Sequence, residues 1–176
     1  MNSTYFIYTG NAYPHKNLSR LIDAVIMLKV KLKIVSGKNV FTERLAKEIK
    51  NKNASKFVEL LGFQTDKELE KLYKNSIAFV FPTLSEGFGL PPMEAINAGT
   101  LVVLSDIPVL KEVYAESGIY FDPFDVNSIA ETLDKVAKIS DTERRNKIIF
   151  AQKFVKKYSW EKMARETLKV YETSSK

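Results

Sequence analysis

Short apolar runs alternate with segments of helical spacing along most of the chain, and this alternation constrains the fold more than any other feature. The runs are rich in β-branched and aromatic residues, which is typical of short buried strands. Between them, apolar residues recur every three or four positions, as they do from Leu18 to Leu28. The expected strands cover residues 5–8, 32–35, 57–61, 77–81, 101–104 and 119–121.

This order of elements predicts an α/β fold with a parallel sheet and right-handed crossovers. We expect a Rossmann-like, doubly wound sheet of six parallel strands in the order 3-2-1-4-5-6, with helices on both faces. A length of 176 residues fits one domain. We therefore expect a single domain over residues 1–176, with the Rossmann-like core over about 1–125 and C-terminal helices over about 126–176.

The C-terminal part is predicted to be wholly helical. The stretches that begin at Ser128 and Ser140 each have a glutamate three positions later, which is typical of a capping box. They predict helices that end near positions 138 and 158. Apolar positions between 159 and about 173 predict one more amphipathic helix, in which Trp160 is expected to be a packing anchor.

Composition excludes several chemistries. The chain has no cysteine, which excludes redox chemistry by thiols, and His15 is the only histidine. A histidine cluster for a metal is therefore absent from the sequence, and we expect no metal site. Neither a Walker A motif nor a Gly-x-Gly-x-x-Gly motif follows the first strand, which argues against ordinary NTPases and NAD-dependent enzymes.

The net charge of +6 is compatible with several anionic partners. Most of the basic residues are lysines mixed with glutamates on helical stretches, so we expect a solvated face and no nucleic-acid partner. No run of apolar residues approaches the length of a spanning helix, and the expected location is the cytoplasm. Lys153, Lys156 and Lys157 crowd around Phe154 and Tyr158, which leaves peripheral contact with the inner membrane face as an alternative.

The predicted strand order places a site at the switch point between strands 1 and 4. The loops that follow these strands, residues 9–17 and 82–94, are the two most unusual loops of the chain. In the second loop, Gly87 and Gly89 allow close approach of the backbone to a ligand. Pro92 suits the first positions of the next helix, whose positive end favours phosphate. Lys16 would add a full positive charge from the first loop.

Two carboxylates flank this second loop. Glu86 and Glu94 cannot coordinate phosphate directly, but carboxylates accept hydrogen bonds from sugar hydroxyls. A ligand with both phosphate and sugar groups would use all of these residues. The alternatives are a solvated loop residue for Glu86 and a helix-stabilising glutamate in the first turn for Glu94. Gly99 is expected to end that helix in a left-handed cap.

At these residues the chain resembles the C-terminal, donor-binding domain of a GT-B glycosyltransferase of family 4, the retaining group called glycosyl transferases group 1. The resemblance covers almost the whole chain. It rests on Gly10 with Lys16 and Asn17, on the Leu61-Gly-Phe63 turn, and above all on residues 82–95. In the last stretch, Glu86 and Glu94 have the Glu-x7-Glu spacing of the family.

The resemblance implies a role for each matching residue. Glu86 would lie beside the donor sugar, and Lys16 would neutralise the diphosphate and stabilise the leaving group, so these two are the expected catalytic residues. Glu94 would bind ribose hydroxyls. The base is expected near Gly37 and the turn at Gly62 and Phe63. The expected donor-binding residues are Gly10, Asn11, Lys16, Gly37, Gly62, Phe63, Glu86, Gly87, Phe88, Gly89, Leu90 and Glu94.

Two departures from the family pattern stand out. Many members have an arginine soon after the glycine of the first loop, where this chain has Asn11. Either Lys16 therefore carries more of the phosphate binding, or another basic residue supplies the second charge. The sequence also starts just before the first strand of the donor domain. We therefore expect the N-terminal acceptor domain to be absent from this chain. The acceptor would be bound by that missing domain or by a separate partner chain.

The resemblance implies transfer of a hexosyl unit from a nucleotide sugar to a glycan or a lipid-linked acceptor, with retention at the anomeric carbon and without a cofactor. The motif Glu-Gly-Phe-Gly-Leu-Pro-Pro looks most like mannosyltransferases, so GDP-mannose is the first expected donor and a UDP-sugar the second. One alternative is a non-catalytic nucleotide-sugar-binding or scaffold subunit that pairs with another glycosyltransferase chain. A fragment of a GT-B nucleotide-sugar epimerase is another.

Overall fold

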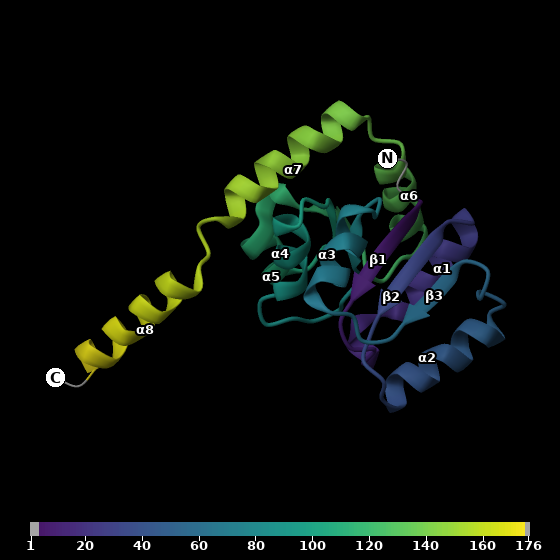
Figure 1. Cartoon of the computed structure of the whole chain (residues 1–176), viewed down its shortest axis with the longest axis horizontal. Coiled ribbons are helices and arrows are strands. Elements are labelled where there is room, and N and C mark those ends of the chain that lie inside the picture. Colours follow the sequence, from purple (N-terminus) through teal and green to yellow (C-terminus); the bar gives the residue numbers. More distant parts are fainter. Residues whose placement is uncertain (1–3, 175–176) are drawn as a thin grey trace.

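A computed structural model describes residues 4–174. It contains one sheet of six parallel strands in the order β3-β2-β1-β4-β5-β6, with helices on both faces (Figure 1). This confirms the predicted Rossmann-like fold, its strand order and the position of every predicted strand to within two residues. The strands are β1 (Tyr5–Thr9), β2 (Lys31–Val35), β3 (Val58–Leu61), β4 (Phe79–Phe81), β5 (Val102–Ser105) and β6 (Ile119–Phe121).

Helices connect the strands and make up the C-terminal part. All of β1, β4 and β5 is buried between the helical layers, which explains why these strands read as continuous apolar runs. The α-helices are α1 (Leu18–Leu28), α2 (Val40–Asn51), α3 (Asp66–Lys74), α4 (Leu90–Asn97), α5 (Pro108–Tyr114), α6 (Val126–Ala137), α7 (Asp141–Val155) and α8 (Trp160–Ser174). Two short 3-10 helices are η1 (Pro14–Lys16) and η2 (Ala115–Ser117).

The start of α6 differs from the prediction. Asp125 caps this helix, because its carboxylate accepts a hydrogen bond of 2.8 Å from the backbone N–H of Asn127. Ser128 lies inside the helix, and its Oγ accepts a bond of 3.0 Å from the backbone N–H of Asp122. The predicted capping box at Ser128 is therefore wrong. An aspartate three residues earlier reaches the free N–H groups first.

The start of α7 agrees with the prediction. Ser140 caps the helix by accepting a bond of 3.2 Å from the backbone N–H of Glu143. The helix ends at Val155, a few residues before the predicted end near 158. The predicted left-handed cap of α4 is confirmed as well, since Gly99 has φ +84° just after that helix.

The last helix, α8, extends away from the body of the protein (Figure 1). None of its residues is buried, and the Trp160 side chain is 70% exposed. The expectation that Trp160 is a packing anchor is therefore wrong within residues 4–174. None of the helices in this part of the chain is both long and apolar enough to cross a lipid bilayer.

Candidate functional site

The loops that follow β1 and β4 lie against each other, as the strand order predicted. The backbone carbonyl of His15 accepts hydrogen bonds from the backbone N–H of Leu84 at 2.8 Å and from the Thr83 hydroxyl at 3.2 Å. Both donors belong to the segment between β4 and α4, whereas His15 lies in η1 after β1. The two loops therefore form one surface at the carboxyl edge of the sheet.

The buried residue Asn17 holds together the loops that form this surface. It is buried and has the left-handed backbone conformation that asparagine tolerates better than most residues, with φ 57°. Its side-chain amide donates to the carbonyl of Pro82 at 3.0 Å and to that of Pro123 at 2.7 Å. One residue thus connects the loops that follow β1, β4 and β6.

The two predicted catalytic residues meet on this surface. The ammonium of Lys16 forms an ion pair with the carboxylate of Glu86, and the two side chains are only 12% and 14% exposed. Lys16 Nζ also lies 5.3 Å from the centroid of the Phe81 ring. Burial and the charge of Glu86 both raise the pKa of Tyr8, which lies beneath the pair and donates to the Asn11 carbonyl at 2.6 Å. The pair places a positive and a negative charge next to each other at the carboxyl ends of β1 and β4.

The glycine-rich stretch after Glu86 offers free backbone donors. No backbone hydrogen bond within residues 4–174 uses the N–H groups of Gly87, Phe88, Gly89 or Leu90. A Cβ added at Gly87 would meet no heavy atom within 4 Å, so the space beside this N–H is open. Gly89 is different: it has φ +85° and caps α4, and its carbonyl accepts a bond from the Tyr114 hydroxyl. Successive unbonded N–H groups of this kind are suited to an anion.

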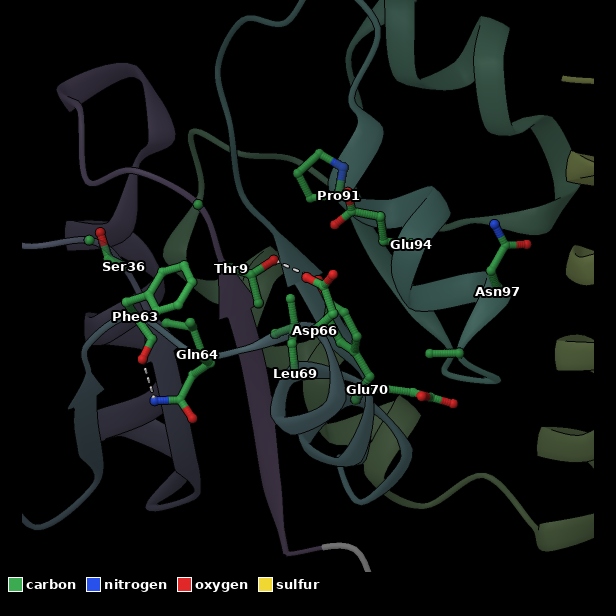
Figure 2. Close-up of a pocket in the computed structure, with 15 residues that line it drawn as sticks. Thr9, Ser36, Phe63, Gln64, Asp66, Leu69, Glu70, Pro91, Glu94 and Asn97 are labelled. Carbon is green, nitrogen blue, oxygen red and sulfur yellow. Dashed lines mark hydrogen bonds between the residues drawn. The ribbon is translucent and has the colours of Figure 1, made fainter. Parts of the chain in front are cut away.

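A pocket of about 750 Å³ adjoins this surface. Figure 2 shows Ser36, Phe63 and Gln64 on one side of it and Pro91, Glu94 and Asn97 on the other, with Thr9 and Asp66 between them. Four predicted donor-binding residues line it, namely Gly10, Gly37, Phe63 and Glu94. The pocket therefore lies between the ends of β1 and β2 and the helices α3 and α4.

Glu94 lines this pocket, and within residues 4–174 no lysine or arginine forms an ion pair with its carboxylate. It is the fifth residue of α4, so the alternative of a first-turn glutamate is wrong; Pro92, similarly, is the third helical residue. Partial burial raises the pKa of the Glu94 carboxyl, and the charge of Asp66 raises it further. A carboxyl placed in this way is available to accept hydrogen bonds from hydroxyl groups of a ligand.

Other predicted residues lie elsewhere. Phe88 and Leu90 line a second cavity of about 430 Å³ between α4 and the start of α8, where the Phe88 ring packs edge-on against Tyr158 with centroids 5.3 Å apart. Asn11 and Gly62 are not among the residues that line either cavity. The side chains of Phe88 and Leu90 therefore face away from the pocket. Their backbone N–H groups can still point toward the surface formed by the loops after β1 and β4.

Sequence reasoning missed much of the pocket wall. The Thr9 hydroxyl and the Tyr73 hydroxyl are 2.7 Å apart and form a buried hydrogen bond at its base. Burial is the main cause that raises the pKa of Tyr73. Thr9 ends β1 and Ser36 directly follows β2, so polar residues at the carboxyl ends of neighbouring strands were an available signal. The pocket-lining residues that sequence reasoning missed include Thr9, Ser36, Gln64, Asp66, Leu69, Glu70, Tyr73, Pro91 and Asn97.

Within residues 4–174, no three histidine, aspartate or glutamate side chains gather closely enough to hold an ion. Asp122 lies in a turn before α6, where its carboxylate accepts a bond of 2.8 Å from the backbone N–H of Phe124. The described site combines one ion pair, free backbone donors and the carboxylates of Asp66, Glu70 and Glu94 in the pocket.

Residues 1–172 match the model of a protein family described as glycosyl transferases group 1. The chain belongs to this family. As a group 1 member, it is similar to the O-antigen chain mannosyltransferase RfbU of Salmonella typhimurium, with 32% identity over 143 residues, 80% of this chain and 40% of that protein. It is also similar to O-antigen chain mannosyltransferase B of Escherichia coli, with 31% identity over 174 residues, 95% of this chain and 45% of that protein.

Solved structures agree on the fold. Sucrose-phosphate synthase from Thermosynechococcus elongatus superposes with a TM-score of 0.82 at 23% identity, over 96% of this chain and 45% of that one. The group 1 chain thus spans less than half the length of the relatives described above. Its fold is that of one half of a GT-B protein.

Proposed function

We propose that the chain is the C-terminal, donor-binding half of a retaining glycosyltransferase. In this proposal it moves a hexosyl unit, first of all mannose from GDP-mannose and otherwise a sugar from a UDP-sugar, to a glycan or lipid-linked acceptor. Membership of glycosyl transferases group 1 supports the reaction class. Two relatives that are mannosyltransferases by name support the sugar.

The meeting of Lys16 and Glu86 carries the proposal. The ion pair brings together the first and second loops at the switch point, directly beside the free N–H groups of Gly87 and Gly89. A diphosphate needs a cation and backbone donors, and a sugar needs an acceptor for its hydroxyl groups. This small surface offers all three.

Lys16 and the backbone donors act on the leaving group. When the bond between the anomeric carbon and the phosphate oxygen breaks, the electron pair stays with the nucleoside diphosphate, which gains negative charge. The Lys16 ammonium and the N–H groups of residues 87–90 are placed to stabilise that charge. The acceptor oxygen then bonds to the anomeric carbon on the same face, and its proton leaves with the diphosphate. Glu86 orients Lys16 and accepts from the sugar hydroxyls.

The pocket accommodates the nucleoside. Glu94 would accept hydrogen bonds from the ribose hydroxyls, and the base would lie near Gly37 and the turn at Gly62 and Phe63. Of these residues, Gly37, Phe63 and Glu94 line the pocket. Gly10 has φ +137°, and a Cβ there would come 3.0 Å from the Tyr8 hydroxyl, so the first loop needs glycine beside the pocket. Asn11 carries no charge, and the proposal gives Lys16 the main share of phosphate binding.

The remaining parts of the proposal concern the surroundings of the chain. The acceptor would be bound by a second domain or a partner chain, because the relatives are more than twice as long as the matched segment. A nucleotide-sugar donor favours a cytoplasmic working location. Neither statement depends on the geometry of the pocket.

Calorimetry on four versions of the chain tests the donor site. GDP, UDP, ADP and their sugars are titrated into the wild type, Lys16→Ala, Glu94→Ala and Lys135→Ala, the last being a matched loss of an exposed lysine on α6. We expect one base family to bind. Lys16→Ala should weaken that binding about 10-fold or more, since a charge-assisted hydrogen bond contributes about 1.5–3 kcal/mol.

The outcomes separate the parts of the proposal. Weaker binding in Lys16→Ala and Glu94→Ala, with Lys135→Ala unchanged, supports a donor site at the switch point. Binding that is equal in all four versions would refute the roles of both residues. Specific binding of UDP or ADP in place of GDP would keep the site and overturn the first choice of donor.

A further inference from the structure

The helix α7 has apolar side chains on two opposite sides. Ala151 and Val155 are buried against the body of the protein, where α7 contacts α4 and η2. Ile149 and Phe150 lie on another side and are 44% and 46% exposed. Packing within residues 4–174 therefore does not explain why two large apolar side chains occupy these positions.

Cations share the exposed side. Arg145, Ile149, Lys153 and Lys156 are spaced by four, four and three residues, so they form one stripe along the helix. Phe150 borders this stripe, and Lys157 follows the helix with its Nζ 3.8 Å from the centroid of the Phe154 ring. We call this surface the basic aromatic face; it consists of Arg145, Ile149, Phe150, Lys153, Lys156 and Lys157.

These cations are not neutralised by the protein. Within residues 4–174, no carboxylate lies within 4.0 Å of the charged groups of Lys153, Lys156 or Lys157. The helix α8 shows the opposite pattern, since Arg165 pairs with Glu161 at 2.7 Å and Lys162 with Glu166 at 3.8 Å.

Acidic side chains do lie near the first half of α7. Lys147 pairs with Glu143 at 3.7 Å, and Glu116 borders a shallow depression beside Phe150. The positive potential is therefore concentrated on the second half of the helix, around Lys153 and Lys156.

We propose that the basic aromatic face of α7 docks on an anionic lipid surface. Lysines next to exposed aromatic and aliphatic side chains are typical of helices that lie in the membrane interface, where headgroups pair with cations and apolar side chains enter the acyl boundary. The helix lies along the outside of the molecule (Figure 1), so a flat surface can reach it. This inference does not depend on the proposed function.

Nucleic acid explains the face less well. A phosphate backbone would use the lysines, but the exposed Ile149 side chain would gain nothing from it, and the Lys157 ammonium already lies over the Phe154 ring. The proposal therefore commits to lipid.

Sedimentation of the 176-residue chain with lipid vesicles tests the proposal. The vesicles are phosphatidylcholine alone or phosphatidylcholine mixed with phosphatidylglycerol, at low and at high salt. We expect binding only to the anionic vesicles, and weaker binding at high salt. Each lysine near the surface should contribute about 5-fold, so Lys153→Gln with Lys156→Gln should weaken binding about 30-fold.

Two matched controls separate this face from the overall charge. Lys47→Gln with Lys50→Gln removes the same charge from the exposed side of α2 and should leave binding nearly unchanged. Phe150→Ala should weaken binding at least about 3-fold, whereas Phe124→Ala, which removes a ring that is 64% exposed elsewhere, should not. All of these positions are exposed, so unchanged thermal midpoints are expected to show that folding is intact.

Several results would overturn the proposal. Equal binding to neutral and anionic vesicles would remove the role of the lysines. Equal losses from the two lysine pairs would assign binding to net charge. An absence of vesicle binding, with or without capture of an oligonucleotide by the same lysines, would reject a lipid surface.

Discussion

Breaking the ion pair between Lys16 and Glu86 should reveal how strongly the two loops of the site depend on each other. Lys16→Met keeps much of the length of the side chain and removes its charge, and Glu86→Gln keeps the shape of the carboxylate. The partners come from loops 70 residues apart in the sequence, and nearly nine tenths of each side chain is shielded from water. Solvent screening therefore weakens this pair much less than an exposed one.

The expected magnitude follows from that burial. Exposed pairs contribute about 0.2–1 kcal/mol, whereas a hydrogen bond between charged groups contributes about 1.5–3 kcal/mol. We take about 2 kcal/mol for the coupling between Lys16 and Glu86. Each single substitution should lower the free energy of unfolding by about that amount, which corresponds to about 4–8 °C in the thermal midpoint for a domain of this size.

A double-mutant cycle measures the coupling directly. Urea unfolding of the wild type, both single variants and the double variant gives four free energies of unfolding. Since either substitution removes the pair, the double variant should cost about as much as one single variant, and not the sum of the two. The contact of Lys16 with the Phe81 ring cancels in the cycle, because it is lost in both versions that lack Lys16. A coupling energy below about 0.5 kcal/mol would refute the reasoning.

Three further changes have expected outcomes. Gly89→Ala should lower the free energy of unfolding by about 1–3 kcal/mol in urea, because φ is +85° and the new Cβ would come 2.9 Å from Leu110 Cδ2; an unchanged midpoint would contradict this. Asn17→Gly keeps the left-handed conformation but leaves two loop carbonyls without their amide donor, so it should cost about 2 kcal/mol in the same assay, and a neutral effect would show that water replaces the amide. Folding raises the pKa of Glu94, so the folded state binds its proton more tightly and stability falls as the pH rises from the ordinary value of 4.5 through the raised one. Glu94→Gln should therefore gain in thermal midpoint relative to the wild type as the pH rises through that window, and Asp66→Asn should reduce the difference; parallel pH profiles would rule this out.

The centre of the sheet was predictable because β1, β4 and β5 are buried on both faces. A parallel strand between two helical layers is apolar along most of its length, and these three strands show this pattern in the sequence. The strand order then places the ends of β1 and β4 together. The meeting of Lys16 and Glu86 follows from topology and needs no knowledge of side-chain packing.

Other features could not be predicted from the sequence, because they depend on competition between possible helix caps or on tertiary packing. Asp125 and Ser128 are both good helix caps, and sequence alone does not say which reaches the first free N–H group. Trp160 was expected to be a packing anchor because tryptophan is usually buried, although none of the described residues of α8 is buried. The wall formed by Asp66 and Tyr73 was missed because α3 reaches the pocket only through its packing on the sheet.

The charges of the site set a condition on any anionic ligand. Carboxylates at Asp66, Glu70 and Glu94 line the pocket, while the nearby cation of Lys16 is already paired with Glu86. An isolated phosphate would therefore gain little from net charge and would depend on the free N–H groups of the second loop. A ligand that also brings hydroxyl groups to Glu86 can share Lys16 with it and satisfy Glu94 at the same time. The nucleotide-sugar donor of the proposed function, with a diphosphate between two polyhydroxylated ends, would meet this condition better than a phosphate alone.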